Sequence, residues 1–455
     1  MAHTGPADPY QNGQNGRGSA DSGQGSPPSP PQSRALWAII AALVAALVVY
    51  EHAHLQFLLG ILIFIVALLV SVMLHELGHF LTAKRFGMRV TQFFVGFGRT
   101  LWSTFRGETE YGVKALPVGG FVKITGMTSM EDVDIAHEPR SFRAKPGWQR
   151  MIVLAAGSFM HFVLALFLLF VLAFGIGQAA YSNTSLVGSI SACVPGSVQA
   201  VDSANPCTSG NLGKSPAELA GMKPGDRIVA VAGRPVGSWS QLHTVLSSEP
   251  VGKPIAVDVR RDGRTVGLTV ELAKIPGRAV PFLGVDRYVV YQRSGFFGSW
   301  GYAGDQFAFT LTSSASAIGR LPAAIPDLFN QNRSHTAAGQ VSSVVGVGEV
   351  TGDVVQAALP WQAKVTVVLY LVASLNIFVG AFNLLPLLPL DGGHLAVVIF
   401  ERIRAWFYRL LRRPDPGLVD VQRLVPVSLV VFAVLVGLGT LLIAADIFNP
   451  VHLQV

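Results

Sequence analysis

The sequence has little charge. Only 13% of its 455 residues are Asp, Glu, Lys or Arg, whereas soluble domains carry about 25%. Half of the residues are hydrophobic, and the mean hydropathy is +0.46. This composition excludes an ordinary cytosolic enzyme and a disordered scaffold. It predicts a membrane protein with a soluble portion attached.

Cysteine is also scarce. The two cysteines, Cys193 and Cys207, exclude a disulfide-dense scaffold and a zinc site built from cysteines. They enclose a stretch rich in Gly, Ser and Asn that looks like a loop insertion. We expect a disulfide between them, with two free thiols as the alternative.

The net charge of +7 comes mostly from two loops beside apolar runs. Residues 84–150 contain 11 Lys and Arg against 6 Asp and Glu, and residues 401–423 contain 6 against 3. This placement favours positive-inside topology over a nucleic-acid surface, so no nucleic-acid partner is expected. Both loops are then cytoplasmic, and the long segment 177–362 lies outside.

The apolar runs predict four or five transmembrane helices. Residues 1–34 are rich in Gly, Pro, Ser, Gln and Asn and predict a disordered cytoplasmic tail. The next run predicts an additional helix, with a helix lying in the membrane interface as the alternative. The expected helices are 35–50, 57–83, 151–176, 363–400 with an interruption at Pro386 and Pro389, and 424–445.

The sequence His75-Glu76-Leu77-Gly78-His79 has the pattern H-E-x-x-H at the end of an apolar helix. Residues i and i+4 share a helix face, so both imidazoles can bind one metal ion, and Glu76 can act as the general base for a zinc-bound water. The alternative is a pair of histidines at the level of the lipid headgroups. Ionisable groups at membrane depth are costly without a function, which favours the metal site.

A third ligand is expected at Asp391. It follows Pro386 and Pro389 and precedes two glycines, so the backbone there should be unwound, which membranes tolerate only inside protein or beside a wet cavity. Two histidines and one carboxylate leave a fourth position for water, the usual arrangement of a hydrolytic zinc site. The alternative is a polar helix end facing the cytoplasm.

These motifs resemble the site-2 protease family of intramembrane zinc metalloproteases, in its bacterial branch with PDZ domains. The resemblance rests on H-E-x-x-H and on the N-x-x-P-x-x-P-L-D-G pattern from Asn383 to Gly392. It implies His75, His79 and Asp391 as zinc ligands and Glu76 as the catalytic acid and base. It also implies Asn383 as a residue that holds substrate backbone or an oxyanion. Asn376 is a weaker candidate for that role.

The resemblance extends to the loop 84–150, which corresponds to a membrane-associated β-hairpin near the active site. Its edge could hold a substrate by strand addition. One position departs from the family: where the second helix usually reads G-P-x-x-N-F, this chain has Ser158 and His161 in place of Pro and Asn. We expect His161 to pack rather than to be a fourth ligand, and His394 to be structural or to support the ligands.

Residues 186–285 resemble a bacterial PDZ domain, which would bind extended peptides without catalysis. Ser215 and Ser238 are expected to cap two short helices, and Asp262-Gly263 to turn a β-hairpin. Residues 286–362 are expected outside or at the membrane surface. The expected fold is thus a polytopic α-helical membrane protein with an extracytoplasmic α+β PDZ domain and a β-hairpin on the cytoplasmic side.

The function expected from these features is zinc-dependent cleavage of transmembrane segments in regulated intramembrane proteolysis. The resemblance implies membrane-protein substrates, often anti-sigma factors, that have already been trimmed outside. The competing classes are a zinc-handling transporter and an inactive scaffold that binds peptides through PDZ. Intact Glu76 argues against the scaffold, and ligands gathered at one level argue against the transporter.

Overall fold

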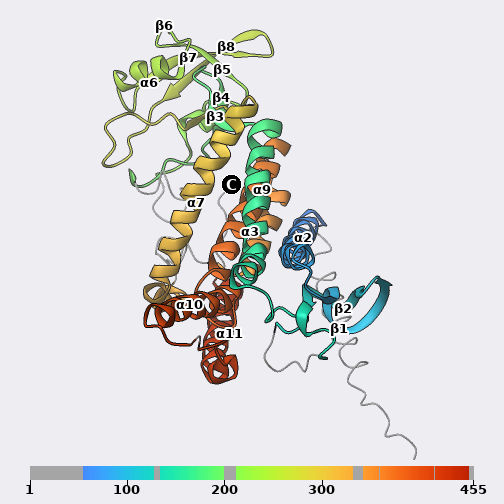
Figure 1. The fold of residues 1–455 in the computed structure, drawn as a ribbon. Coiled ribbons are helices and arrows are strands. Elements are labelled where there is room, and N and C mark those ends of the chain that lie inside the picture. The colour runs from blue at the N-terminus through green and yellow to red at the C-terminus, as the bar shows by residue number, and fades with distance from the viewer. Residues whose placement is uncertain are drawn as a thin grey trace, which may run out of the picture. The chain divides into compact units, whose positions relative to one another are not determined.

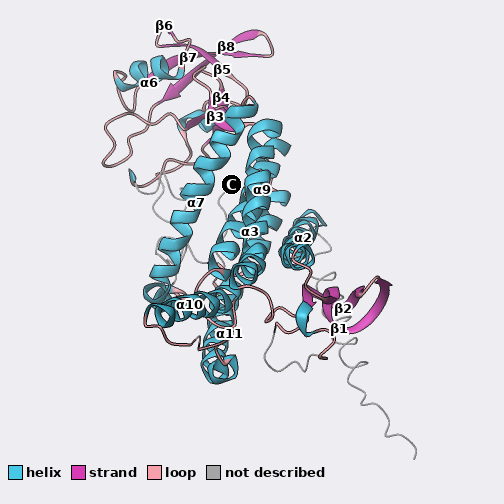
Figure 2. Cartoon of the chain, viewed as in Figure 1, coloured by secondary structure: helices cyan, strands magenta, loops and turns pink. Residues whose placement is uncertain are grey.

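The computed structural model describes residues 55–127, 134–198, 207, 212–330, 342–357, 359–414 and 416–449. The predicted tail 1–34 and the predicted helix 35–50 lie outside the described residues. Figure 1 traces the described elements, and Figure 2 shows the same view coloured by helix, strand and loop.

Within the described residues, four helices are long and apolar enough to cross a membrane. Many of their large apolar side chains face outward; Phe432, for example, is 53% exposed. Apolar side chains on the outside of a helix are stable against lipid. The protein is therefore a multi-pass helical membrane protein with additional β regions. The four helices are α2 (Leu55–Arg85), α3 (Gly147–Val171) with its π-helical continuation η2 (Leu172–Ile176), α9 (Trp361–Asn383) and α11 (Val425–Phe448).

The segment 363–400, expected as one interrupted helix, forms two helices. Helix α9 ends at Asn383, and α10 (Asp391–Leu410) begins only after a turn that contains both prolines. Proline lacks an N–H and clashes with the preceding turn, so the first helix cannot continue. As a result, Asp391 lies in the first turn of a new helix. A short 3₁₀ helix, η6 (Val421–Leu424), then leads into α11.

The loop between α2 and α3 is a curled β-hairpin of strands β1 (Val90–Arg106) and β2 (Thr109–Ile124). Residues 92–95 of β1 pair with two parts of β2, 110–113 and 120–123, because both strands fold back on themselves. The sheet thereby gains more paired strands than a simple hairpin would have. Its far part exposes large apolar side chains: Phe97, Leu101, Trp102 and Phe105.

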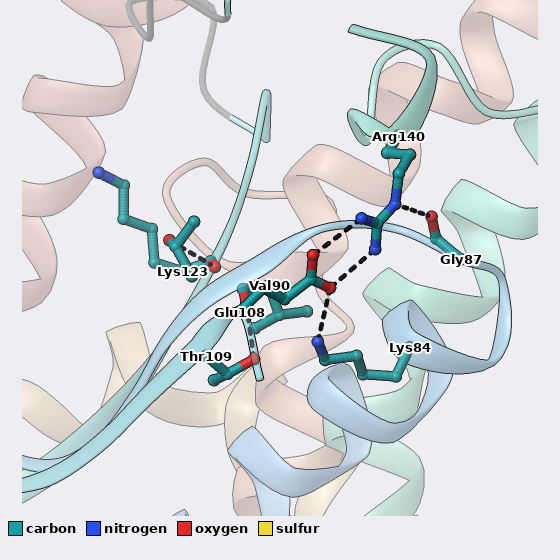
Figure 3. Close-up of polar contacts among 8 residues, drawn as sticks. Lys84, Gly87, Val90, Glu108, Thr109, Lys123 and Arg140 are labelled. Carbon is teal, nitrogen blue, oxygen red and sulfur yellow. Dashed lines mark hydrogen bonds and ion pairs between the residues drawn. The ribbon is translucent and has the colours of Figure 1, made fainter. Parts of the chain in front are cut away.

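Charged side chains tie the turn of this hairpin to the end of α2, as Figure 3 shows. Glu108 accepts hydrogen bonds from Arg140 at 2.7 and 2.8 Å and from Lys84 at 2.8 Å. Arg140, in the 3₁₀ helix η1 (Glu138–Arg140), also donates to the carbonyl of Gly87. Hydrogen bonds from Arg140 and then from Lys84 lower the pKa of Glu108 to about 2.

Between α3 and helix α7 (Phe296–Ala324) lies a region of short helices and antiparallel strands, referred to below as the α/β region. Its main sheet has four antiparallel strands in the order β6-β5-β7-β8, and two further strand pairs, β3–β10 and β4–β9, join its ends. The core is aliphatic, with Ile228, Val257 and Val259 fully buried. The elements are β3 (Gln178–Tyr181), β4 (Val187–Ile190), α5 (Pro216–Leu219), β5 (Arg227–Val231), β6 (Arg234–Pro235), α6 (Trp239–Ser247), β7 (Pro254–Arg261), β8 (Arg264–Glu271), β9 (Val285–Arg287) and β10 (Val289–Gln292).

The helix caps and the hairpin turn predicted in this region are present. The Ser215 side chain accepts from the amide of Glu218, and the Ser238 side chain accepts from that of Gln241, so each serine caps a helix. Asp262 and Gly263 both adopt positive φ in the turn from β7 to β8. The predicted disulfide between Cys193 and Cys207 is present. The region is a small α+β unit of antiparallel sheets, and its identity as PDZ stays a prediction.

The segment after this region is helical. Helix α7 (Phe296–Ala324) packs against the bundle: Trp300 stacks on Phe170 of α3 at 4.7 Å, and Phe307 lies edge-on to Phe162 at 5.5 Å between ring centroids. The 3₁₀ helix η3 (Ile325–Asp327) follows, and α8 (Val344–Gln356) comes after residues 331–341, which are outside the described part. Helix α7 therefore lies along the spanning helix α3. The placement of residues 286–362 outside or at the membrane surface stays a prediction.

Candidate metal centre

Helix α2 supplies two of the three predicted ligands from one face. His75 and His79 are one helical turn apart, and both are buried, at 8% and 4% exposure. Their Nε2 atoms lie 3.1 Å apart. The i, i+4 spacing read from the sequence therefore brings the two imidazoles together as expected.

Asp391 reaches the same place from the first turn of α10. Its Oδ2 atom lies 3.1 Å from His75 Nε2 and 3.2 Å from His79 Nε2. The preceding turn folds tightly onto this helix end, since a Cβ on Gly393 would lie only 2.5 Å from the amide nitrogen of Leu388. The two glycines after Asp391 thus allow the turn before α10 to pack closely against the start of that helix, which positions the Asp391 carboxylate.

The three donor atoms fit a zinc ion. Ligands on one face of a zinc tetrahedron with bonds near 2.0 Å stand ~3.3 Å from one another, close to the edges of 3.1 and 3.2 Å found here. His79 Nδ1 donates to the carbonyl of Val153 at 2.7 Å, which leaves Nε2 with its lone pair for the metal. Among the described residues, these three form the one such group of His, Cys, Asp and Glu.

Helix α3 lies close enough to this group that only glycine fits at position 157. A Cβ on Gly157 would stand 2.5 Å from His75 Cε1 and 2.7 Å from His75 Nε2, inside the imidazole surface. Gly78 similarly lets α2 approach the Ala156 carbonyl of α3. Close helix contacts of this kind depend on small residues. The sequence contains these glycines, but nothing local shows that they face the ligands.

Glu76 lies between the ligands and the hairpin. Its Oε2 atom accepts a hydrogen bond from the backbone amide of Val122 in β2 at 3.0 Å. Gly120 of the same strand faces Met73 and Glu76, where a side chain would collide with the Met73 sulfur. The hairpin strand therefore lies directly beside the expected catalytic carboxylate. Its contact with Glu76 was not foreseen from the sequence.

The two asparagine candidates have different surroundings. Asn376 in α9 is buried and donates its amide hydrogens to the Val372 carbonyl at 2.8 Å and the Ser71 hydroxyl at 3.0 Å. Asn383 ends α9, is half-buried, and has no side-chain hydrogen bond to the residues that the structure describes. Asn383 is thus free to contact a substrate, whereas Asn376 is occupied within the protein.

The two further histidines, His161 and His394, also have different surroundings. His161 of α3 packs on His75 with ring centroids 5.0 Å apart, and its Nδ1 bonds to Asn376 Oδ1 at 2.7 Å. His394 instead lines a cavity of 300 Å³ together with Arg150 and Glu401. Those two residues form a buried ion pair at 2.6 Å between α3 and α10. This pair helps hold the helix that carries Asp391 against α3.

The chain is similar over most of its length to known proteases. The model of peptidase family M50 matches residues 63–410. The zinc metalloprotease Rip1 of Mycobacterium tuberculosis strain H37Rv is 35% identical over 419 residues, which cover 88% of this chain and 99% of that protein. The metalloprotease MmpA of Caulobacter vibrioides is 30% identical over 386 residues, covering 76% of this chain and 88% of that protein. The regulator of sigma-E protease RseP of Salmonella typhimurium is 27% identical over 427 residues, covering 75% and 90%.

Proposed function

The chain belongs to peptidase family M50, and we propose that it uses the His75, His79 and Asp391 group to cleave transmembrane segments of other membrane proteins. It is a zinc metalloprotease with several membrane-spanning helices. The observation that carries the proposal is the triangle of three donor atoms placed beside Glu76 between spanning helices.

In this proposal, the two Nε2 atoms and Asp391 Oδ2 hold the ion. Zinc, when bound, polarises a carbonyl and lowers the pKa of water to about 7. Glu76 accepts a proton from the attacking water and later delivers a proton to the nitrogen of the leaving amine as the C–N bond breaks. His79 keeps its lone pair for the metal because its other nitrogen donates to Val153.

The substrate would be bound in extended form beside β2. A peptide bond inside a helix is shielded by its own hydrogen bonds, so the substrate must unwind near the cleavage point, which helix-breaking residues favour. The β2 strand faces the site at Gly120 and Val122. An unwound segment could add to this strand through backbone hydrogen bonds, with Asn383 as a further contact to its backbone.

The substrates are proposed to be single-span regulators of the anti-sigma-factor type, trimmed beforehand outside the membrane. The support is the name of the Salmonella relative, a regulator of sigma-E protease. Within this proposal, the α/β region acts as a PDZ domain outside the membrane. It excludes substrates whose external portion is still bulky, while the metal group lies nearer the cytoplasmic side, beside the basic loop that begins at Lys84.

The competing functions have less support. A zinc transporter should place ligands along a path, whereas the described residues hold one group with metal-ligand geometry. An inactive scaffold would not need a carboxylate beside that group, yet Glu76 is present and positioned by the Val122 amide.

Replacing Glu76 by Gln tests the function. The variant keeps all three ligands but cannot accept the proton, so purified enzyme should contain one zinc per chain while cleavage of a single-span substrate falls by about 10²-fold or more. Membranes of cells with this variant should accumulate trimmed stubs, identified by mass spectrometry. Asp391→Asn is the matched variant and should lose zinc together with activity. Cleavage at the wild-type rate by zinc-loaded Glu76→Gln enzyme would contradict the proposal.

A further inference from the structure

His161 stands beside the metal group without belonging to it. It is one helical turn after Gly157 on α3, is 3% exposed, and packs its ring on that of His75. The group of three donor atoms does not include it. A buried histidine at this depth in the bundle needs a hydrogen-bonding role, because an unsatisfied ring nitrogen is costly to bury.

The hydrogen bonds around Asn376 have one possible direction. The carbonyl of Val372 can only accept, so the Asn376 atom bonded to it must be the amide nitrogen. The same nitrogen donates to the Ser71 hydroxyl, which in turn donates to the Ala67 carbonyl at 2.8 Å. Asn376 Oδ1 is therefore an acceptor, and His161 Nδ1 must carry the hydrogen that it donates at 2.7 Å.

These hydrogen bonds determine which tautomer the neutral His161 ring adopts. A neutral imidazole has one N–H, and here it is at Nδ1, so Nε2 presents a lone pair. Within the described part of the chain, no hydrogen bond to Nε2 of His161 is present. In its neutral form, the His161 ring therefore presents a lone pair at Nε2 beside His75, and the bonds through Asn376 and Ser71 fix the ring from α9 and α2.

We propose that His161 is a positioning residue that accepts one hydrogen of the attacking water. A water molecule has two hydrogens, and Glu76 removes one as a proton. The second can be held by Nε2 of His161, which would orient the oxygen lone pair toward the substrate carbonyl. No bond forms to His161 and no proton transfers to it. The proposal rests on the proteolytic function proposed above.

Two substitutions separate this role from packing. Asn at position 161 places its amide near the position of Nδ1, so it can keep the bond to Asn376 but has no atom at Nε2. Gln is longer and places an oxygen near the position of Nε2, at the expense of the Asn376 bond. We expect His161→Asn to lower kcat about tenfold with unchanged KM, since one hydrogen bond is lost only as the water is oriented. His161→Gln should stay within about threefold of wild type.

The opposite order, with wild-type kcat in folded His161→Asn and a loss in His161→Gln, would show a packing role and overturn the proposal. A rise in KM at constant kcat would also overturn it, because it would indicate a contact to the substrate itself. Asn376→Ala is an independent variant: it frees the ring to change tautomer and should lower kcat by a similar factor. The double variant with His161→Asn should then show no further loss. Additive losses would contradict the proposal.

Metal binding gives a readout besides activity. In Co²⁺-substituted enzyme, His161→Asn should leave the visible absorption bands and the stoichiometry of one metal per chain unchanged. Displaced bands or lost metal would make His161 a ligand and overturn the positioning role. Ser158→Ala is the control and should keep wild-type kcat. It removes a buried hydroxyl of the same helix that has no hydrogen-bond partner among the described residues. Wild-type enzyme that cleaves nothing in the same assay would instead refute the proposed function.

Discussion

The metal centre buries several polar side chains, whereas the core of the α/β region is aliphatic. Around the metal centre, the interior holds His75, His79, His161, Asn376 and Ser71, while the outer faces of the helices are apolar. In the α/β region, the interior is aliphatic and the charged residues lie at the surface or, like Asp226, pair with an arginine. Because lipid accepts the apolar outer faces of the helices, polar side chains can lie among the buried apolar ones in the helix interior. The α/β region instead folds by burying aliphatic side chains.

Asp226 shows how the α/β region treats a buried carboxylate. Burial acts to raise its pKa, but two hydrogen bonds from Arg261 and one from the Lys223 amide outweigh burial and lower it. At the metal centre, the described neighbours of Asp391 Oδ2 are two histidine nitrogens instead of an arginine. In the proposed zinc site, a bound cation would supply the compensating charge.

The largest expected effect comes from adding a methyl group at the metal centre. Gly157→Ala would place a Cβ against the His75 ring, so the ligands must separate. Displacement of reacting groups by about 1 Å can lower rates by about 10²-fold. We expect a loss of at least that size in cleavage, with less than one zinc per chain by elemental analysis. Gly439→Ala, whose Cβ would meet nothing within 4 Å, is the control. Full zinc content and activity in Gly157→Ala would contradict the geometry.

Removing the α/β region should change which substrates are cleaved and leave the cleavage reaction itself intact. A variant that lacks residues 186–285 should still bind zinc and cut trimmed substrates within about tenfold of the wild-type rate, because all three ligands lie elsewhere in the chain. It should also cut untrimmed substrates, which we expect the wild type to reject. The measurement is cleavage of matched long and trimmed substrates by purified enzyme. A stable, zinc-loaded variant that cuts only trimmed substrates would contradict the proposal that the α/β region excludes bulky substrates.

A cavity in the α/β core should affect stability alone. Ile228→Ala removes a fully buried side chain and should destabilise this region by about 3 kcal/mol. Hydrogen exchange should show faster opening of β5 and β7, while zinc content stays at one per chain. Val266→Ala, on the half-buried face of β8, should have a smaller effect. Loss of zinc in Ile228→Ala would mean that the two regions are not independent.

The smallest effect is expected where the turn of the β1–β2 hairpin contacts the end of α2. Glu108→Gln removes the carboxylate shared by Lys84 and Arg140 and should cost about 1 kcal/mol at neutral pH. Since the folded pKa of Glu108 is about 2, below its ordinary value of 4.5, its contribution is complete above about pH 4.5 and is lost as the pH falls toward 2. The difference in melting temperature between wild type and variant should shrink over that interval. A difference in melting temperature that does not change with pH would contradict this account.

Several features of this protein followed from short stretches of sequence. H-E-x-x-H places two imidazoles on one face of α2 whatever surrounds it, because the helical repeat alone sets that spacing. The prolines and glycines around Asp391 predicted a break in the helix, and the structure has one. The break separates two helices, because α9 ends at Asn383 and α10 begins at Asp391. The serine caps and the Asp262-Gly263 turn are equally local.

Other features were decided only by the tertiary structure. Val122 is 46 residues from Glu76 in the chain, and Asn376 is 215 residues from His161 and 305 from Ser71. No local pattern encodes which of several buried polar groups will meet across such separations. That choice depends on how closely α2, α3 and α9 approach, and their approach depends on glycines such as Gly78 and Gly157. The sequence by itself determined which residues could bind a metal, whereas helix packing determined which hydrogen bonds orient them, because packing brings together groups that the chain keeps apart.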